Sequence, residues 1–295
     1  AEEVSKTILV VGGGVAGITA ALESAAAGYE VVLVEKQAQL GGFVASLRQG
    51  YPQAPPYVGL TPEGMAEKIQ EVLYHPKIKV YTSARIKETS GQPGMFDVTL
   101  EAGGTDVKTR VGAIVMATGW KPYDPSKLAH LGYGLSPDVI TNVEFERMAA
   151  EGPVKRPSDG RPAESVLFIQ CAGSRDKDHL PYCSSVCCMA TLKQAALIHE
   201  RNADAKVFVV YKDMRTPGQY ERFYRQVQDH PLTFMTKGEV QAVEAGPKGG
   251  LKVSVNNTLL GEEVAIAADL VVLAAGMVPN AADGEAIRAL EDAKI

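Results

Sequence analysis

Cysteine is scarce in this 295-residue sequence, which contains four, and tryptophan occurs once. No apolar stretch reaches the roughly 18 residues that a membrane helix requires, and no basic segment followed by an apolar one marks a signal peptide. The net charge is −5 and no block of Lys and Arg occurs, so nothing favours a nucleic-acid partner. These absences predict a cytoplasmic protein without direct membrane insertion, so any association with a membrane would come through a partner.

The few cysteines are clustered. Cys171, Cys183, Cys187 and Cys188 all lie in one short stretch of a long chain. A secreted disulfide framework spreads its cysteines so that they join distant segments. Local clustering in an otherwise cysteine-free chain predicts instead a metal or redox site inside a cell.

Apolar runs alternate with helical segments, and this order predicts an α/β fold. Residues 6–11 form a short apolar run typical of a buried parallel strand, 15–27 are rich in Ala and Leu as in a helix, and 29–34 form a second strand. Further strands are predicted at 77–82, 96–101, 106–110, 113–117, 165–170, 206–211 and 269–274, and further helices at 62–73 and 186–201.

The turn between the first strand and the first helix carries a dinucleotide fingerprint. Gly12, Gly14 and Gly17 have the G-x-G-x-x-G spacing, with Val15 and Ala16 at the start of the helix. Gly12 permits the tight turn, Gly14 lets a pyrophosphate approach the backbone, and Gly17 lets helix and strand pack closely. The helix N-terminus offers free N–H groups to phosphates. A glycine-rich structural turn is the alternative.

An acidic residue at the end of the second strand favours the dinucleotide site over a structural turn. Glu35 is placed where a carboxylate accepts hydrogen bonds from ribose hydroxyls. The sequence around it resembles two-dinucleotide-binding flavoproteins, which indicates FAD rather than NAD. The resemblance extends over Glu35, Lys36, Gly41 and Gly42, over Arg85 and Ile86, where the family contacts adenine through the backbone, and over Ala117, Thr118 and Gly119. Phe43, directly after Gly42, departs from the family pattern and is a further candidate cofactor-binding residue.

A polar stretch at 152–164, with three prolines and two glycines, predicts a domain boundary. We expect an FAD-binding domain formed by 1–150 and 270–295, with an inserted nucleotide-domain-like unit at 160–268. The predicted fold class is therefore α/β with two Rossmann-like, thioredoxin-reductase-like domains, the second inserted in the first.

The second unit lacks the glycine fingerprint that a nicotinamide nucleotide site requires. After the strand at 165–170 the phosphate-binding turn is replaced by the cysteines, in the spacing C-x₁₁-C-x₃-C-C. Adjacent cysteines do not easily reach one tetrahedral zinc ion, whereas a 4Fe–4S cluster offers four separate iron corners. The spacing favours the cluster, and zinc, a redox dithiol and inert thiols stay open as alternatives.

The cysteine segment also carries a family resemblance. The sequences IQCAGSRD at 169–176 and YCSSVCCM at 182–189 resemble the flavoprotein A subunit of heterodisulfide reductases. They are also similar to flavoprotein subunits of the quinone-interacting membrane-bound oxidoreductase complex. The stretches 132–134, 139–146 and 273–279 resemble the same family.

This resemblance implies a function. The matching cysteines, Cys171, Cys183, Cys187 and Cys188, hold a 4Fe–4S cluster in that family, beside a thioredoxin-reductase-like FAD domain. We therefore expect an oxidoreductase that transfers electrons as one component of a heterodisulfide-reductase-like or quinone-linked complex in anaerobic energy metabolism, with other redox subunits as partners. No separate catalytic side chains stand out in the sequence. A stand-alone NAD(P)H-dependent flavin oxidoreductase and a non-catalytic zinc-binding scaffold are the alternatives.

The resemblance also implies a closing segment over the flavin ring. Family members carry a sequence resembling G-V-F-A-A-G-D there, and Ile295 stands about where that segment begins. We expect this sequence to be a fragment of a longer chain, or the flavin site to be completed by other means.

Overall fold

The computed structural model describes residues 4–283, which divide into two compact units. Within this range, unit 1 takes the residues up to Arg48, Glu63–Lys121 and those from Pro279; unit 2 takes Gln49–Pro62 and Pro122–Val278. No helix of the described part is long and apolar enough to cross a membrane.

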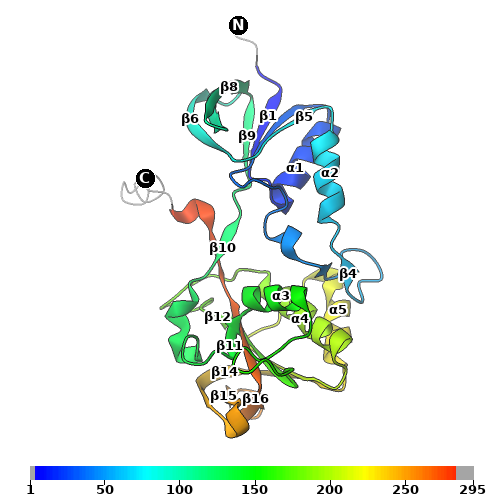
Figure 1. Cartoon of the computed structure of the whole chain (residues 1–295), viewed down its shortest axis with the longest axis vertical. Helices are drawn as coiled ribbons and strands as arrows, with labels where there is room; N and C mark the ends of the chain where they lie inside the picture. Colours follow the sequence, from blue (N-terminus) through cyan, green and yellow to red (C-terminus); the bar gives the residue numbers. More distant parts are fainter. Residues whose placement is uncertain (1–3, 284–295) are drawn as a thin grey trace. The chain divides into compact units, whose positions relative to one another are not determined.

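Unit 1 is built on a parallel sheet of four strands in the order β5-β2-β1-β9. Its main elements are β1 (Thr7–Val11), α1 (Val15–Ala26), β2 (Glu30–Val34), α2 (Met65–Tyr74), β5 (Ile78–Tyr81) and β9 (Ala113–Met116). An antiparallel sheet joins it, with β6 (Ala84–Gln92), β7 (Met95–Ala102) and β8 (Thr105–Val111). Figure 1 shows α1 and α2 together on one side of the parallel strands.

The two faces of the parallel sheet in unit 1 belong to different cores. Alternate residues of β1 separate them: Val10 packs with Ile18 of α1 and Val72 of α2, whereas Leu9 packs with Leu100 and Val111 of the antiparallel sheet. Side chains on a strand point alternately to opposite faces, so an all-apolar strand such as β1 serves both cores. The result is a three-layer unit of helices, parallel sheet and antiparallel sheet.

Unit 2 contains a seven-stranded sheet in the order β11-β17-β12-β13-β14-β15-β16. Its strands are β11 (Val139–Thr141), β12 (Ser165–Ala172), β13 (Lys206–Tyr211), β14 (Thr233–Ala245), β15 (Leu251–Asn257), β16 (Glu262–Ala268) and β17 (Leu270–Ala275). The first five in spatial order run parallel, and β15 and β16 continue antiparallel. The helices are α3 (Asn142–Glu151), α4 (Cys187–Arg201) and α5 (Glu221–Gln228). Phe168 on β12 packs with Phe145 of α3, Leu192 of α4 and Phe223 of α5 in one core.

The short elements complete the chain order. They are η1 (Val44–Ser46), β3 (Gln49–Gly50), β4 (Thr61–Pro62), β10 (Trp120–Pro122), η2 (Pro125–Leu131), η3 (Gly218–Tyr220), η4 (Pro247–Gly249), β18 (Met277–Pro279) and η5 (Asn280–Asp283). β3 pairs with β4, and β10 with β18.

The unit boundaries differ from those expected from the sequence. The expected first domain, 1–150 with 270–295, includes β11, α3 and β17, but all three belong to unit 2. The reason is strand pairing: β17 lies between β11 and β12, with Val271 opposite both Val139 and Leu167. Besides the short segment Gln49–Pro62, unit 2 is therefore formed by the continuous stretch from Pro122 to Val278. The part of the prediction that covers 284–295 lies outside the described residues.

Two stacked histidines in unit 2 make its stability depend on pH. The rings of His199 and His230 lie 3.6 Å apart between centroids, and His199 Nε2 lies 2.8 Å from Thr233 Oγ1. Burial and the neighbouring His230 lower the pKa of His199 from 6.5 to about 4. Between these two values the unfolded chain binds a proton that the folded chain does not, so the free energy of unfolding falls as the pH falls from 6.5 to about 4.

We expect His199→Gln to flatten this pH dependence, because glutamine keeps a polar partner for Thr233 but does not titrate. Denaturant unfolding at a series of pH values measures it. His75→Gln serves as the control, since that side chain lies in a loop of unit 1. Equal slopes for His199→Gln and the wild type would contradict the assignment.

Candidate functional site

The glycine loop of unit 1 has the geometry of a phosphate cradle. A Cβ on Gly17 would lie 1.7 Å from the Gly12 carbonyl oxygen, so α1 approaches β1 too closely for any side chain there. A Cβ on Gly12, where φ is +109°, would lie 2.1 Å from the Ala117 oxygen. No protein atom lies within 4 Å of a Cβ on Gly14. Two of the glycines are thus required by packing, and the third leaves open space at the N-terminus of α1.

Glu35 closes the strand side of this cradle. Its side chain is buried, with the residue 9% exposed, and its two carboxylate oxygens accept hydrogen bonds from the Gly13 N–H at 2.6 Å and the Gln37 N–H at 2.7 Å. These backbone bonds fix the carboxylate beside the glycine turn. Each oxygen has a second lone pair, so the carboxylate retains the capacity to accept a ribose hydroxyl.

The second glycine pair lies directly against the first loop. The Gly41 N–H donates to the Gly13 oxygen at 2.7 Å, and a Cβ on Gly42 would lie 3.2 Å from Gly14 Cα. Both glycines have positive φ, at +107° and +56°. The structure therefore brings together the two glycine segments that the sequence places far from each other along the chain.

Ala117, Thr118 and Gly119 form the third wall of the cradle, and Asn280 holds it. The Asn280 side chain donates from Nδ2 to the Thr118 oxygen at 2.7 Å, and its backbone N–H donates to the Gly119 oxygen at 3.1 Å. Sequence reasoning did not select Asn280; the available signal was its position directly after the apolar return segment that ends at Pro279. The rings of Phe43 and Trp120 pack edge to face, with centroids 5.2 Å apart.

The remaining predicted cofactor residues lie at the edge of this group or outside it. Val15 and Ala16 begin α1 and are exposed, and Lys36 is exposed after β2. Arg85 and Ile86 lie on β6, where the Arg85 side chain turns to Glu101 in an ion pair at 2.7 Å. The Arg85 side chain is therefore directed toward the outer face of the antiparallel sheet, and a role for Arg85 and Ile86 through their backbone stays a prediction.

The cysteines form a second site, in unit 2, where β12 ends and α4 begins. Cys171 lies near the end of β12, Cys183 lies in the loop, and Cys187 and Cys188 are the first residues of α4. Backbone hydrogen bonds close the loop on itself, from Arg175 N–H to the Tyr182 oxygen and from Leu180 N–H to the Gly173 oxygen.

The loop is also tied to the end of β17. The Met277 N–H donates to Ser184 Oγ at 2.8 Å, and Tyr182 Oη donates to the Met277 oxygen at 3.1 Å. Cys187 Sγ lies 3.7 Å from the Ala275 oxygen, toward which it points as a donor. These contacts place the cysteine loop at the carboxyl edge of the parallel strands, the usual position of ligand sites in α/β sheets.

All four cysteines are free thiols. Burial raises the pKa of Cys187 to about 12, with the charges of Cys188, Cys171 and Cys183 as further causes. Burial also raises the pKa values of Cys188 and Cys171; the Arg215 backbone N–H opposes the shift at Cys188, and the charge of Arg175 opposes it at Cys171. Without a bound ion the buried thiols stay protonated at neutral pH, and a metal group that takes them as ligands displaces their protons.

Among residues 4–283, no three His, Cys, Asp or Glu side chains converge closely enough to hold a single metal ion. Adjacent Cys187 and Cys188 at a helix start suit a cubane, in which neighbouring ligands bind different iron atoms.

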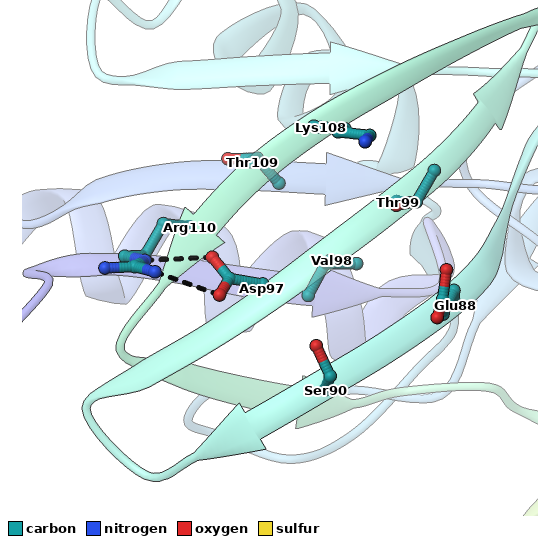
Figure 2. Close-up of a pocket in the computed structure, with 8 residues that line it drawn as sticks. All are labelled: Glu88, Ser90, Asp97, Val98, Thr99, Lys108, Thr109 and Arg110. Carbon is teal, nitrogen blue, oxygen red and sulfur yellow. Dashed lines mark hydrogen bonds and ion pairs between the residues drawn. The ribbon is translucent and has the colours of Figure 1, made fainter.

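A separate hollow of about 400 Å³ lies on the outer face of the antiparallel sheet in unit 1. Figure 2 shows its lining of polar side chains, with the Arg110 guanidinium joined to both carboxylate oxygens of Asp97. Arg110 and Asp97 thus pair with each other on the exposed face of the sheet. The hollow contains neither the glycine cradle nor the cysteines, so we do not assign the function to it.

Comparison with protein families and curated proteins identifies relatives of this chain. Residues 7–118 match the family described as FAD dependent oxidoreductase, which confirms the predicted oxidoreductase class and supports FAD. The iron–sulfur A subunit of the CoB–CoM heterodisulfide reductase of Methanocaldococcus jannaschii is 32% identical, over 94% of this chain and 54% of its own length. The A subunit of the H(2)/formate:CoB-CoM heterodisulfide,ferredoxin reductase of Methanococcus maripaludis is 31% identical, over 98% of this chain and 56% of its own length. The chain spans about half the length of the curated relatives it matches.

Solved structures confirm the predicted fold class. Thioredoxin reductase from Lactococcus lactis matches with a TM-score of 0.56 at 16% identity, over 92% of this chain and 78% of that one. Thioredoxin reductase from T. acidophilum matches with a TM-score of 0.53 at 16% identity, over 94% and 79%. The fold is therefore the thioredoxin-reductase-like α/β fold.

Proposed function

Because this chain is homologous over 94% of its length to the A subunits of heterodisulfide reductases, we propose that it is the FAD- and 4Fe–4S-carrying electron-transfer part of a heterodisulfide-reductase-like complex. Four free cysteines, placed where a second phosphate-binding turn would stand, carry this proposal. A stand-alone NAD(P)H enzyme would need that turn.

The residues of unit 1 would bind the adenosine and diphosphate part of FAD. The open space over Gly14 admits a diphosphate to the N–H groups of α1, and the fixed carboxylate of Glu35 accepts ribose hydroxyls. Phe43 and Trp120 supply an aromatic pair beside the Thr118–Gly119 turn.

The cysteines of unit 2 would hold the cluster, one thiolate to each iron corner. When both groups are bound, FAD supplies exchange of electron pairs and the cluster supplies single-electron steps. The chain's own contribution would be to position the ligands: backbone hydrogen bonds order the loop that contains Cys183, and the first turn of α4 contains Cys187 and Cys188. Partners would be other redox subunits, including those of a quinone-linked complex, and contact with the inner membrane would come through them.

Anaerobic purification with analysis of flavin, iron, acid-labile sulfide and zinc tests the proposal. We expect one FAD and about four irons with equal sulfide per chain, and a broad visible absorption beneath the flavin bands. Flavin without iron would contradict the cluster assignment, and stoichiometric zinc would favour a structural metal site. Rapid bleaching of the flavin by NADH would favour a stand-alone NAD(P)H oxidoreductase.

A further inference from the structure

Arg175 is the charged residue most closely built into the cysteine loop. Its backbone N–H donates to the Tyr182 oxygen at 3.0 Å, and its φ of +54° is in the left-handed region that few non-glycine residues occupy. The backbone is thus held in an uncommon conformation between Cys171 and Cys183. Its side chain is 25% exposed.

The Arg175 guanidinium forms an ion pair through one terminal nitrogen, while the other terminal nitrogen lacks a partner among the described residues. Nη2 donates to Asp213 Oδ2 at 2.7 Å, and Asp213 is held in turn by Lys237 Nζ at 3.3 Å. Nη1 is buried and has no hydrogen-bond partner within the described part of the chain. A buried donor without a partner costs free energy, so the orientation is one that a negatively charged neighbour would stabilise.

That neighbour is the cysteine site. The Ser174 N–H donates to the Cys171 oxygen at 3.0 Å, so a tight turn joins Arg175 to Cys171. Two other cations are near the site, but they are held less firmly: Lys212 pairs with Glu239 at 3.6 Å, and Arg215 faces an open pocket of about 390 Å³ beside Ser185. Asp213 also joins the two ends of the site, because Cys188 Sγ points to its backbone oxygen at 3.8 Å.

We propose that Arg175, held by Asp213, is a positioning residue that raises the reduction potential of the metal group bound through Cys171. This inference rests on the proposed function of the cysteine site. Reduction adds negative charge to an iron–sulfur group, so a fixed cation beside one of its thiolate ligands stabilises the reduced state. The Asp213 ion pair keeps the guanidinium from turning to solvent.

A redox titration of the anaerobic full chain, followed by electron paramagnetic resonance, tests this proposal. We expect Arg175→Gln to shift the cluster midpoint potential to a more negative value, and Arg175→Lys, which keeps the charge, to shift it less. Arg222→Gln on α5, an exposed position, serves as the control and leaves the potential unchanged. The flavin couple in the same samples is an internal reference and stays constant.

The signal comes only from loaded chains, so incomplete loading of a variant does not alter its midpoint. An unchanged potential in Arg175→Gln would overturn the proposal, and so would a shift in Arg175→Lys as large as that in Arg175→Gln. A wild-type chain that binds iron in no form would instead show that the proposed function of the cysteine site is wrong.

Discussion

Replacing Gly14 by alanine is expected to weaken FAD binding at least about tenfold, or about 1.4 kcal/mol, while the chain folds normally. Gly14 has φ −80° and ψ −174°, which any residue adopts, and no protein atom lies within 4 Å of the added Cβ. The methyl group therefore meets nothing in the protein. It projects into the space at the start of α1 that the FAD diphosphate would occupy, and it holds the phosphates away from the backbone N–H groups.

Gly64→Ala is a matched control for this prediction. Gly64 precedes α2 as Gly14 precedes α1, its φ is −83°, and it too has nothing within 4 Å of an added Cβ. FAD titration by fluorescence quenching, together with thermal unfolding by circular dichroism, separates binding from folding. Equal FAD affinity of the Gly14→Ala and Gly64→Ala variants would show that the diphosphate does not lie over Gly14.

By contrast, Gly17→Ala should lower both the stability of the chain and its affinity for FAD, because the added methyl group would collide with the Gly12 oxygen.

The glycine cradle was predictable because its geometry depends on the backbone alone. The spacing of Gly12, Gly14 and Gly17 determines how a strand, a turn and a helix can pack, whatever the rest of the chain does. The clustering of the four cysteines was predictable for a related reason: they lie between the end of β12 and the start of α4, so few distant contacts determine where they are. That they hold a metal group stays a prediction.

Features that depend on partners distant along the chain were not predictable. The residues of β17 have the apolar pattern of a buried strand, but the pattern does not say which sheet contains it, and the strand pairs with β11 and β12 in unit 2. The predicted start of a helix at Pro62 was wrong because Thr61 and Pro62 pair with Gln49 and Gly50 as a short strand, and α2 begins at Met65. Strand β6 was missed because most of its side chains are polar and exposed.

The same limit applies to the residues that support each site. Asn280 donates a hydrogen bond to Thr118, and Asp213 accepts one from Arg175, although the two residues of each pair lie far apart in the sequence. Asp213 follows the carboxyl end of β13, and strand ends at that edge of a parallel sheet are where ligand-binding side chains gather. This position marks Asp213 as a candidate site residue from the sequence alone, whereas its ion pair with Arg175 is seen only in the structure.

Replacing Cys183 by serine is expected to remove most of the iron while FAD remains bound. A serine hydroxyl does not ionise at neutral pH as a metal-bound thiol does, so one corner of the cluster would lose its ligand. The Ser185 N–H donates to Cys183 Sγ at 3.3 Å, and a serine oxygen accepts the same bond, so the loop should keep its conformation. The glycine cradle and Glu35 belong to unit 1, which the substitution does not touch.

Ser185→Gly is the matched control, because it lies in the same loop and its φ of +61° suits glycine. We expect this variant to keep its iron, since its side chain is not a ligand in the proposed site. Iron, sulfide and FAD analysis of both variants gives the result, and the visible spectrum shows loss of the broad absorption with the flavin bands retained. Full iron content in Cys183→Ser would exclude this cysteine as a required ligand. Loss of FAD together with iron would show that the two sites depend on each other for folding, because the glycine cradle and the cysteine loop share no residue.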